Sequence, residues 1–149
     1  MNLVDQAQQM ALKAHFGQSN NHDDEPYVLH LQRVYISTRD AGLDEIHQAV
    51  AWLHDTLEDT NLTVSEIING LGADESAACI ASGVLSLTKI QSETNEHYYH
   101  CVKSNPVAKA VKLHDLHDNF GRNHLIEDEA TRLRMAHKYS LGIDILTRS

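Results

Sequence analysis

Apolar and polar residues alternate with a helical period along most of the chain. In residues 2–16, apolar side chains at Leu3, Ala7, Met10 and Ala14 recur at spacings of three and four, which places them on one face of a helix. The strict alternation expected for strands is short wherever it occurs, and clusters of β-branched residues are few. The pattern therefore predicts an all-α protein.

Turn and capping residues divide this pattern into separate helices. Pro26 can occupy the first turn of a helix, because its missing N–H costs nothing there. Thr63 and Glu66 form a capping-box pattern at the start of another helix. Residues 17–25 are polar and are expected to form a loop. The expected helices cover residues 2–16, 26–40, 44–58, 63–70, 74–88, 92–103, 106–121 and 127–147.

Length and composition favour one helical domain. A chain of 149 residues is long enough to bury a sizeable core. With 42% apolar and 22% charged residues, and few glycines and prolines, it has the composition of an ordered, helix-rich protein. We expect residues 1–149 to form a single bundle of seven or eight helices.

Charge and cysteine usage narrow the classes of partner. The formal net charge of −9 and the scattered basic residues disfavour nucleic acid, so an anionic partner would need local positive charge, which a metal ion could supply.

No apolar run reaches the ~18–20 residues that span a bilayer, and the N-terminal segment lacks the pattern of a secretory signal. Cys79 and Cys101 are not closely spaced, so reduced thiols in the cytoplasm are the default and a disulfide is the alternative. We expect a cytoplasmic protein with no membrane or nucleic-acid partner, and the oligomeric state stays open.

The stretch AWLHDTLEDT, residues 51–60, carries the most suggestive chemistry. His54, Asp55, Glu58 and Asp59 follow directly behind an apolar run. On one helix, His54 and Glu58 would be neighbours at i and i+4, as would the two aspartates. Three carboxylates this close repel one another, and a divalent cation would relieve the repulsion. The stretch is therefore either the solvated face of an ordinary helix or part of a metal site.

A His-Asp pair alone is weak evidence, because the chain contains four of them. The other pairs lie at residues 22–23, 114–115 and 117–118, the first of them in an acidic loop. His30 and Asp115 are each flanked by apolar residues. Taken singly, a histidine such as His30 is more often a satisfied core residue than a ligand, and Asp115 could belong to an ordinary amphipathic helix.

In sequence order, His30, His54-Asp55 and Asp115 resemble the ligand order of the HD-domain metal phosphohydrolases. The segments AHFGQ (14–18), PYVLH (26–30), AWLHDTLEDT (51–60), GVLSLTK (83–89) and VKLHDLHDN (111–119) occur in the order and approximate spacing of the hydrolase domain of RelA/SpoT-type proteins. They look most like its small stand-alone, SpoT-like members, which hydrolyse nucleotide alarmones. The resemblance covers about residues 5–145, and the Glu-Asp pair after His-Asp is its most specific part.

The resemblance implies an all-α HD-domain bundle that removes the 3′-pyrophosphate of guanosine tetra- and pentaphosphate in a Mn²⁺-dependent reaction. By position, the residues that resemble the family's metal ligands are His30, His54, Asp55 and Asp115. Two imidazoles and two carboxylates suit Mn²⁺ or Fe²⁺, and less specifically Zn²⁺ or Mg²⁺. The family's catalytic acidic pair is matched by Glu58 and Asp59. Its substrate contacts are matched by Asn119 and Tyr139.

The chain departs from the family where the nucleotide is held. After Gly-Gln the family usually carries basic residues, whereas this chain has Ser19, Asn20, Asn21 and His22. After the last ligand the family often reads Asp-Arg-Leu-His-Asn, whereas residues 115–119 read Asp-Leu-His-Asp-Asn. A second positive group is thus expected to be missing. An adenine alarmone, or another nucleotide with a 3′-phosphate or pyrophosphate, becomes more plausible as the substrate.

Lys112 is a further candidate for contact with the substrate. It lies three residues before Asp115 and could help to neutralise phosphate groups if both side chains share a helical face. A solvated surface lysine is an equally good interpretation.

Two other functions stay open. The first is an HD phosphohydrolase for a nucleoside monophosphate or a cyclic phosphodiester, which the missing basic residues favour and the Glu58-Asp59 pair and Asn119 oppose. The second is a non-catalytic module that senses a nucleotide. The presence of all four ligand candidates and both acids opposes it.

Overall fold

The computed structural model describes residues 1–20 and 24–148, and within these ranges the chain is helical. The one β-type contact is an isolated antiparallel bridge between Ser19 and Pro26 in the described part of the chain. The all-α prediction is confirmed. The elements are α1 (Leu3–Ala14), α2 (Tyr27–Asp40), α3 (Glu45–Leu53), α4 (Thr56–Asp59), α5 (Val64–Gly70), α6 (Glu75–Ser86), α7 (Asn95–Lys103), α8 (Pro106–Arg122), the 3₁₀ turn η1 (Asn123–Leu125) and α9 (Glu129–Thr147).

Side-chain caps determine where most of these helices begin. The predicted capping box is present: the Thr63 hydroxyl accepts from the Glu66 N–H, and the Glu66 carboxylate accepts from the Thr63 N–H. Asn105 caps α8, with Pro106 in its first turn. The carboxylates of Asp44 and Asp74 cap α3 and α6 in the same way. Short polar signals in the sequence thus account for these boundaries.

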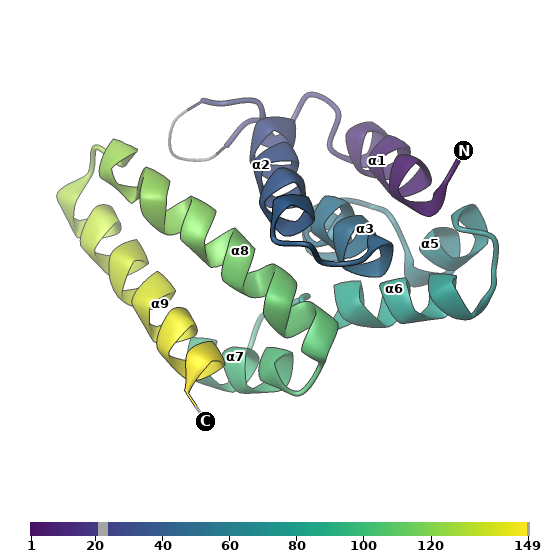
Figure 1. Ribbon diagram of the computed structural model, residues 1–149. Coiled ribbons are helices and arrows are strands. Elements are labelled where there is room, and N and C mark those ends of the chain that lie inside the picture. The colour runs from purple at the N-terminus through teal and green to yellow at the C-terminus, as the bar shows by residue number, and fades with distance from the viewer. Residues whose placement is uncertain (21–23, 149) are drawn as a thin grey trace.

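Helix α3 lies at the centre of the bundle. It packs against α1, α2, α6 and α8, while α8 and α9 run side by side along one flank of the molecule and α7 packs against both (Figure 1). All five residues at the end of α3 are fully or almost fully buried: Ala49, Val50, Ala51, Trp52 and Leu53. The chain that leaves α3 therefore emerges inside the molecule, next to α2 and α8.

The prediction of one continuous helix over residues 44–58 is wrong. The helix ends at Leu53, and Asp55 has φ −105° and ψ 1° before α4 begins. The Thr56 hydroxyl donates to the Leu53 carbonyl, and the His54 ring donates to the Ala51 carbonyl, each at 2.7 Å. These side chains take up carbonyls near the end of α3, which favours a turn over continuation of the helix. His54 and Glu58 consequently lie on either side of a break.

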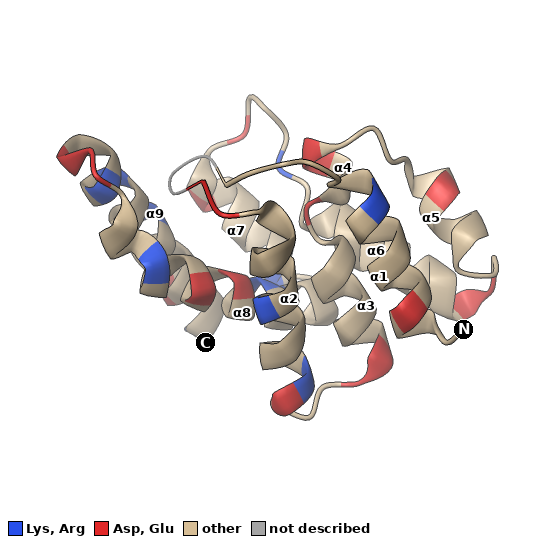
Figure 2. Ribbon diagram, turned by 90° about the horizontal axis from the view of Figure 1, so that it is seen from above, with Lys and Arg blue, Asp and Glu red and all other residues tan. Residues whose placement is uncertain are grey.

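Charged residues are spread over many elements. Figure 2 shows lysines and arginines on separate helices, interspersed with aspartates and glutamates. Within the described residues, no helix is both long enough and apolar enough to cross a membrane. Cys79 and Cys101 are both exposed and are not joined in a disulfide.

Gly142 allows α9 to approach its neighbours closely. A Cβ atom at this position would lie 2.7 Å from Cζ of Tyr99 on α7 and 2.8 Å from Cδ1 of Leu116 on α8. Both neighbours are buried in the core and have little room to move. The glycine therefore sets how near α9, and the residues it carries, stand to the centre of the molecule.

Replacing Gly142 by alanine is expected to destabilise the fold by about 1–3 kcal/mol, because the added methyl group overpacks the contact with Tyr99 and Leu116. Urea unfolding followed by circular dichroism measures this change. Gly121→Ala is the matched control: Gly121 lies in α8, its added Cβ would meet no atom within 4 Å, and the change should be neutral or slightly stabilising. Equal effects of the two substitutions would contradict the packing argument.

Candidate functional site

Three helices bring a cluster of histidines and carboxylates together in the core. His30 comes from α2, His54 follows α3, and Asp115 comes from α8. They are 2%, 1% and 3% exposed, and potential ligand atoms of all three lie within 4.8 Å of one another. Asp55 joins them, since its Oδ2 lies 3.1 Å from Nε2 of His54. Residues that the sequence separates by up to 85 positions thus form one cluster that can hold a metal ion.

The ring of His54 has a defined orientation. Its Nδ1 lies 2.7 Å from the Ala51 carbonyl, and because a carbonyl can only accept, Nδ1 carries the proton. In a neutral ring Nε2 is therefore a bare lone pair. This buried atom makes no hydrogen bond, although Oδ2 of Asp55 and Oδ1 of Asp115 lie 3.1 and 3.3 Å away. A lone pair facing two carboxylate oxygens fits a bound cation.

His30 is held from behind by a second carboxylate. Its Nε2 lies 2.8 Å from Oδ1 of Asp115, and its Nδ1 lies 2.7 Å from Oδ2 of Asp118. Burial lowers the pKa of His30, but hydrogen bonds to these carboxylates outweigh it and raise the pKa to about 9. A carboxylate on Nδ1 leaves Nε2 to face a metal, which is a common arrangement behind metal-binding histidines.

The two aspartates of the cluster differ in their ionisation. Burial, together with the negative charge of Asp115, raises the pKa of Asp55 well above its usual range. The Tyr27 hydroxyl also donates to Oδ2 of Asp55. Burial acts on Asp115 in the same direction, but the Lys112 ammonium and His54 outweigh it and hold the pKa of Asp115 well below its usual range. Two carboxylates this close repel each other when both are ionised, and a divalent cation would relieve that repulsion. The donor set of two imidazoles and two carboxylates fits such an ion.

The acidic pair of α4 lies at the open side of this cluster. Carboxylate oxygens of Asp55, Glu58 and Asp59 lie within 4.8 Å of one another. Glu58 is exposed, and its Oε1 accepts from the Lys89 N–H at 2.7 Å. Burial and the charge of Glu58 raise the pKa of Asp59. The pair therefore sits where a water molecule and a substrate could reach it.

A cleft of about 380 Å³ leads down to the cluster. Apart from His54, which lies buried beneath it, every site residue expected from the sequence lines this cleft: His30, Asp55, Glu58, Asp59, Lys112, Asp115, Asn119 and Tyr139. Of the two interpretations of Lys112 that the sequence allows, the solvated surface lysine is wrong. The Lys112 side chain is 15% exposed, and its Nζ donates to Oδ2 of Asp115 at 2.7 Å.

Two substrate candidates from the sequence stand beside the cluster. The Asn119 amide nitrogen lies 3.3 Å from Oδ1 of Asp115, one helical turn earlier on α8. Tyr139, on α9, is 7% exposed and forms part of the cleft wall. Both side chains are therefore placed to contact a molecule in the cleft.

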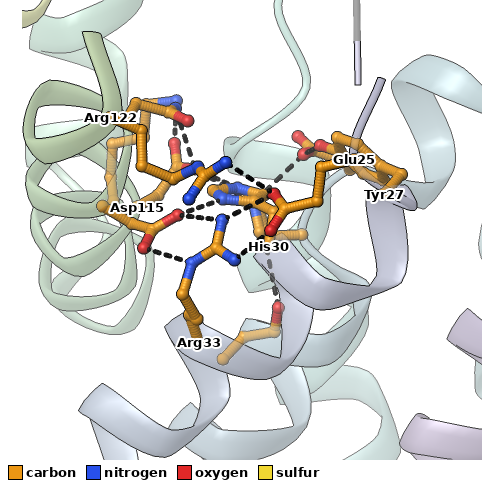
Figure 3. Close-up of polar contacts among 12 residues, drawn as sticks. Glu25, Tyr27, His30, Arg33, Asp115 and Arg122 are labelled. Carbon is orange, nitrogen blue, oxygen red and sulfur yellow. Dashed lines mark hydrogen bonds and ion pairs between the residues drawn. The ribbon is translucent and has the colours of Figure 1, made fainter. Parts of the chain in front are cut away.

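The loop before α2 is fastened to the rest of the protein through Glu25. Arg33 donates to both carboxylate oxygens of Glu25, at 2.6 and 2.9 Å, and Arg122 approaches the same carboxylate at 3.5 Å. Figure 3 shows the two arginines converging on Glu25. Arg33 also donates to both oxygens of Asp118, at 2.8 and 3.1 Å. One guanidinium group thus links this loop to the carboxylate behind His30.

The loop wall of the cleft is uncharged where the structure describes it. Gln18, Ser19 and Asn20 line the cleft, and Asn21 and His22 lie outside the described residues. The cations that line the cleft come instead from α8 and α9, as Lys112 and Lys138. Two lysines from other positions thus line a cleft in which the family's basic residues are missing.

Four residues of the site were missed by sequence reasoning: Tyr27, Arg33, Asp118 and Lys138. Asp118 belongs to one of the four His-Asp pairs and was treated only as a departure from the family. Arg33 follows His30 by three residues, so a shared helical face could have suggested it. No sequence pattern connects Lys138 with the carboxylates of α4.

Comparison with known proteins shows which enzymes the chain is similar to. No model of a known protein family matches the chain. A guanosine-3′,5′-bis(diphosphate) 3′-pyrophosphohydrolase of Aquifex aeolicus is 33% identical over 121 residues, which are 78% of this chain and 17% of that protein. A probable enzyme of the same name from Synechocystis is 37% identical over 81 residues, or 54% of this chain and 10% of that protein. The chain thus spans less than a fifth of either relative.

A solved structure extends the likeness to the whole fold. A metazoan ortholog of SpoT that hydrolyses ppGpp superposes with a TM-score of 0.82, covering 99% of this chain and 86% of that one at 21% identity. The chain is thus similar in sequence to part of the SpoT-type hydrolases and similar in fold to a SpoT ortholog. The resemblance expected from the sequence is confirmed. The cleft is therefore interpreted by comparison with SpoT-type hydrolase domains.

Replacing Asp118 by asparagine is expected to weaken binding of a divalent cation by about 10–100-fold, because His30 loses the carboxylate that orients its ring and increases its basicity. Isothermal titration calorimetry with Mn²⁺ and Zn²⁺ measures the affinity. Asp144→Asn, at an exposed position on α9, is the control and should bind as the wild type does. Unchanged affinity in Asp118→Asn would show that this carboxylate does not support the site.

Proposed function

We propose that the chain hydrolyses guanosine tetra- and pentaphosphate at the 3′-pyrophosphate, with a divalent cation, in the first place Mn²⁺, held by His30, His54, Asp55 and Asp115. The observation that carries the proposal is the convergence of these four side chains with the Glu58-Asp59 pair in one cleft. The names of the relatives from Aquifex and Synechocystis support the choice of substrate.

A divalent cation in this cluster would make water a stronger acid and neutralise negative charge on the phosphoryl oxygens. Hydrogen bonds within the protein orient the two histidine rings for such a cation. The Ala51 carbonyl and Asp118 hold the protonated nitrogens of His54 and His30, so that both Nε2 atoms face the cluster. The proposed ligand set is therefore oriented by the protein itself.

Glu58 and Asp59 are proposed to handle the proton of the attacking water. Glu58 is exposed to the cleft and anchored through the Lys89 N–H, so its second oxygen is available as a base. Water attacks the phosphorus next to the 3′ oxygen, its proton passes to the carboxylate, and the P–O bond to the sugar breaks. The 3′ oxygen takes up a proton, and pyrophosphate is released. Asp59 supports Glu58 from the same turn of α4.

The remaining cleft residues are proposed to hold the substrate. The Lys112 ammonium stands next to Asp115, where it can offset phosphate charge. Asn119 offers an amide to the sugar or a phosphate, and Tyr139 offers a ring surface and a hydroxyl. These contacts place the 3′-pyrophosphate towards the cluster.

Glu58→Gln is expected to retain the metal and to lower kcat by about 10²–10⁴-fold, because an amide cannot accept the proton of the attacking water. Release of pyrophosphate measures kcat, and calorimetric titration with Mn²⁺ measures the metal affinity. Glu75→Gln in the first turn of α6 serves as the control and should leave both quantities unchanged. Turnover at the wild-type rate in Glu58→Gln would remove this residue from the mechanism.

The activity itself is tested on metal-free protein reloaded with Mn²⁺, Fe²⁺, Zn²⁺ or Mg²⁺. The substrate panel contains guanosine and adenosine nucleotides with 3′-pyrophosphates, ordinary nucleoside mono- and diphosphates, and cyclic phosphodiesters. We expect pyrophosphate from the 3′-substituted compounds alone, and no product after chelation. A metal-loaded protein that hydrolyses none of them would support a nucleotide-sensing role instead.

The adenosine compounds are included for a specific reason. The described residues of the loop wall are Gln18, Ser19 and Asn20, which carry amides and a hydroxyl and no cation that could stack on a base. An adenine alarmone is therefore the second candidate substrate, and the ratio of kcat/KM between the two bases decides between them.

A further inference from the structure

The cleft is acidic, yet its proposed substrate is a polyanion. Asp55, Glu58 and Asp59 line it together with Asp115. A cation at the cluster would neutralise only the phosphate groups bound there. The phosphates at the other end of the nucleotide need positive charge from the protein itself.

Lys112 is already engaged within the protein. Its Nζ lies 2.7 Å from Oδ2 of Asp115 and 5.5 Å from the centre of the Tyr98 ring. The lysine therefore serves the carboxylate of the cluster, and its charge acts close to the proposed metal.

Lys138 stands on a different wall of the cleft. It belongs to α9, which packs on α7 and α8 and lies on the far side of α8 from α2 (Figure 1). The side chain lines the cleft and is half-buried, and no carboxylate within the described residues pairs with its ammonium. Gly142, one turn further along α9, holds the helix close against Tyr99 and Leu116, so the position of this wall is set by tight packing.

The surroundings of Lys138 favour an anionic ligand. Burial and the positive charges of Lys112 and Lys89 lower the pKa of Lys138, and the carboxylates of Asp115 and Glu58 oppose this shift without outweighing it. A partly desolvated ammonium near two other cations, without its own counter-ion, gains most from a phosphate group that enters the cleft. With the cleft empty, the Lys138 ammonium forms no ion pair with any carboxylate of the described residues.

We propose that Lys138 binds a phosphate group of the nucleotide that lies away from the proposed metal cluster, on the 5′ side of a guanosine or adenosine 3′,5′-bis(diphosphate). The inference rests on the proposed function and deepens it. Lys138 supplies from α9 the positive charge that the loop after Gln18 does not offer in its described part. It makes the 5′-phosphates a determinant of substrate choice.

Calorimetric titration of the Mn²⁺-loaded Glu58→Gln protein tests the inference without turnover. The two ligands are guanosine 5′-diphosphate 3′-diphosphate and guanosine 3′-diphosphate, which lacks the 5′-phosphates. Adding Lys138→Gln should weaken binding of the first ligand by about tenfold or more, the effect of losing one charged hydrogen bond, and leave the second unchanged. Lys138→Arg should retain most of the affinity. Arg134→Gln, at an exposed position on the same helix, should have no effect.

Steady-state kinetics in the Glu58-containing protein give a second readout. Lys138→Gln should raise KM for the bis(diphosphate) with little change in kcat, because the contact lies away from the reacting phosphorus. Circular dichroism and the thermal midpoint confirm that each variant is folded.

The outcomes separate this inference from the proposed function. Equal binding of the bis(diphosphate) with and without Lys138→Gln overturns the inference, whatever the activity of the wild type. Equal loss for both ligands places the contact on the 3′ side and also overturns it. If the wild type hydrolyses no nucleotide, the proposed function fails, whereas a selective loss of binding in Lys138→Gln still supports the phosphate contact.

Discussion

The hydrogen bond from the His54 ring to the Ala51 carbonyl is the constraint on which the site depends. It orients the imidazole, points Nε2 towards the cluster, and occupies a carbonyl at the end of α3 where the chain turns. Since α3 is the central helix, the turn opens between α2 and α8, which carry His30 and Asp115. The local contact thus fixes the His54 ring at the point where the packing of α2, α3 and α8 brings three distant segments together.

Around that point two carboxylates lie close together and need positive charge or a cation nearby. The carboxylates of Asp55 and Asp115 both belong to the cluster. Lys112 donates to Asp115, and behind His30 lies Asp118, which Arg33 holds in place. A buried arrangement of this kind is stable only when its charges are paired or bind a cation. The same guanidinium group of Arg33 fixes Glu25, so the loop wall of the cleft and the cluster are mechanically connected.

Much of the fold could be predicted because its signals are local. The capping box at Thr63 and the proline at the start of α8 act within one helical turn, and the helices begin where they predict. The prediction of one continuous helix over residues 44–58 was wrong for a local reason of another kind. The side chains of His54 and Thr56 compete for main-chain carbonyls. Periodicity of apolar residues does not report such competition.

The sequence by itself determined the helical class and the resemblance to SpoT-type hydrolases, and it pointed to His30, His54, Asp55 and Asp115 as ligand candidates, because residue type and order along the chain carry that information. Only the tertiary structure decided that Lys112 points inward, that Asp118 stands behind His30, and that Lys138 faces the cleft from α9. These contacts depend on how α8 and α9 are rotated and how closely they approach. That is set by the packing of buried surfaces, including Gly142 against Tyr99, and not by spacing along the chain.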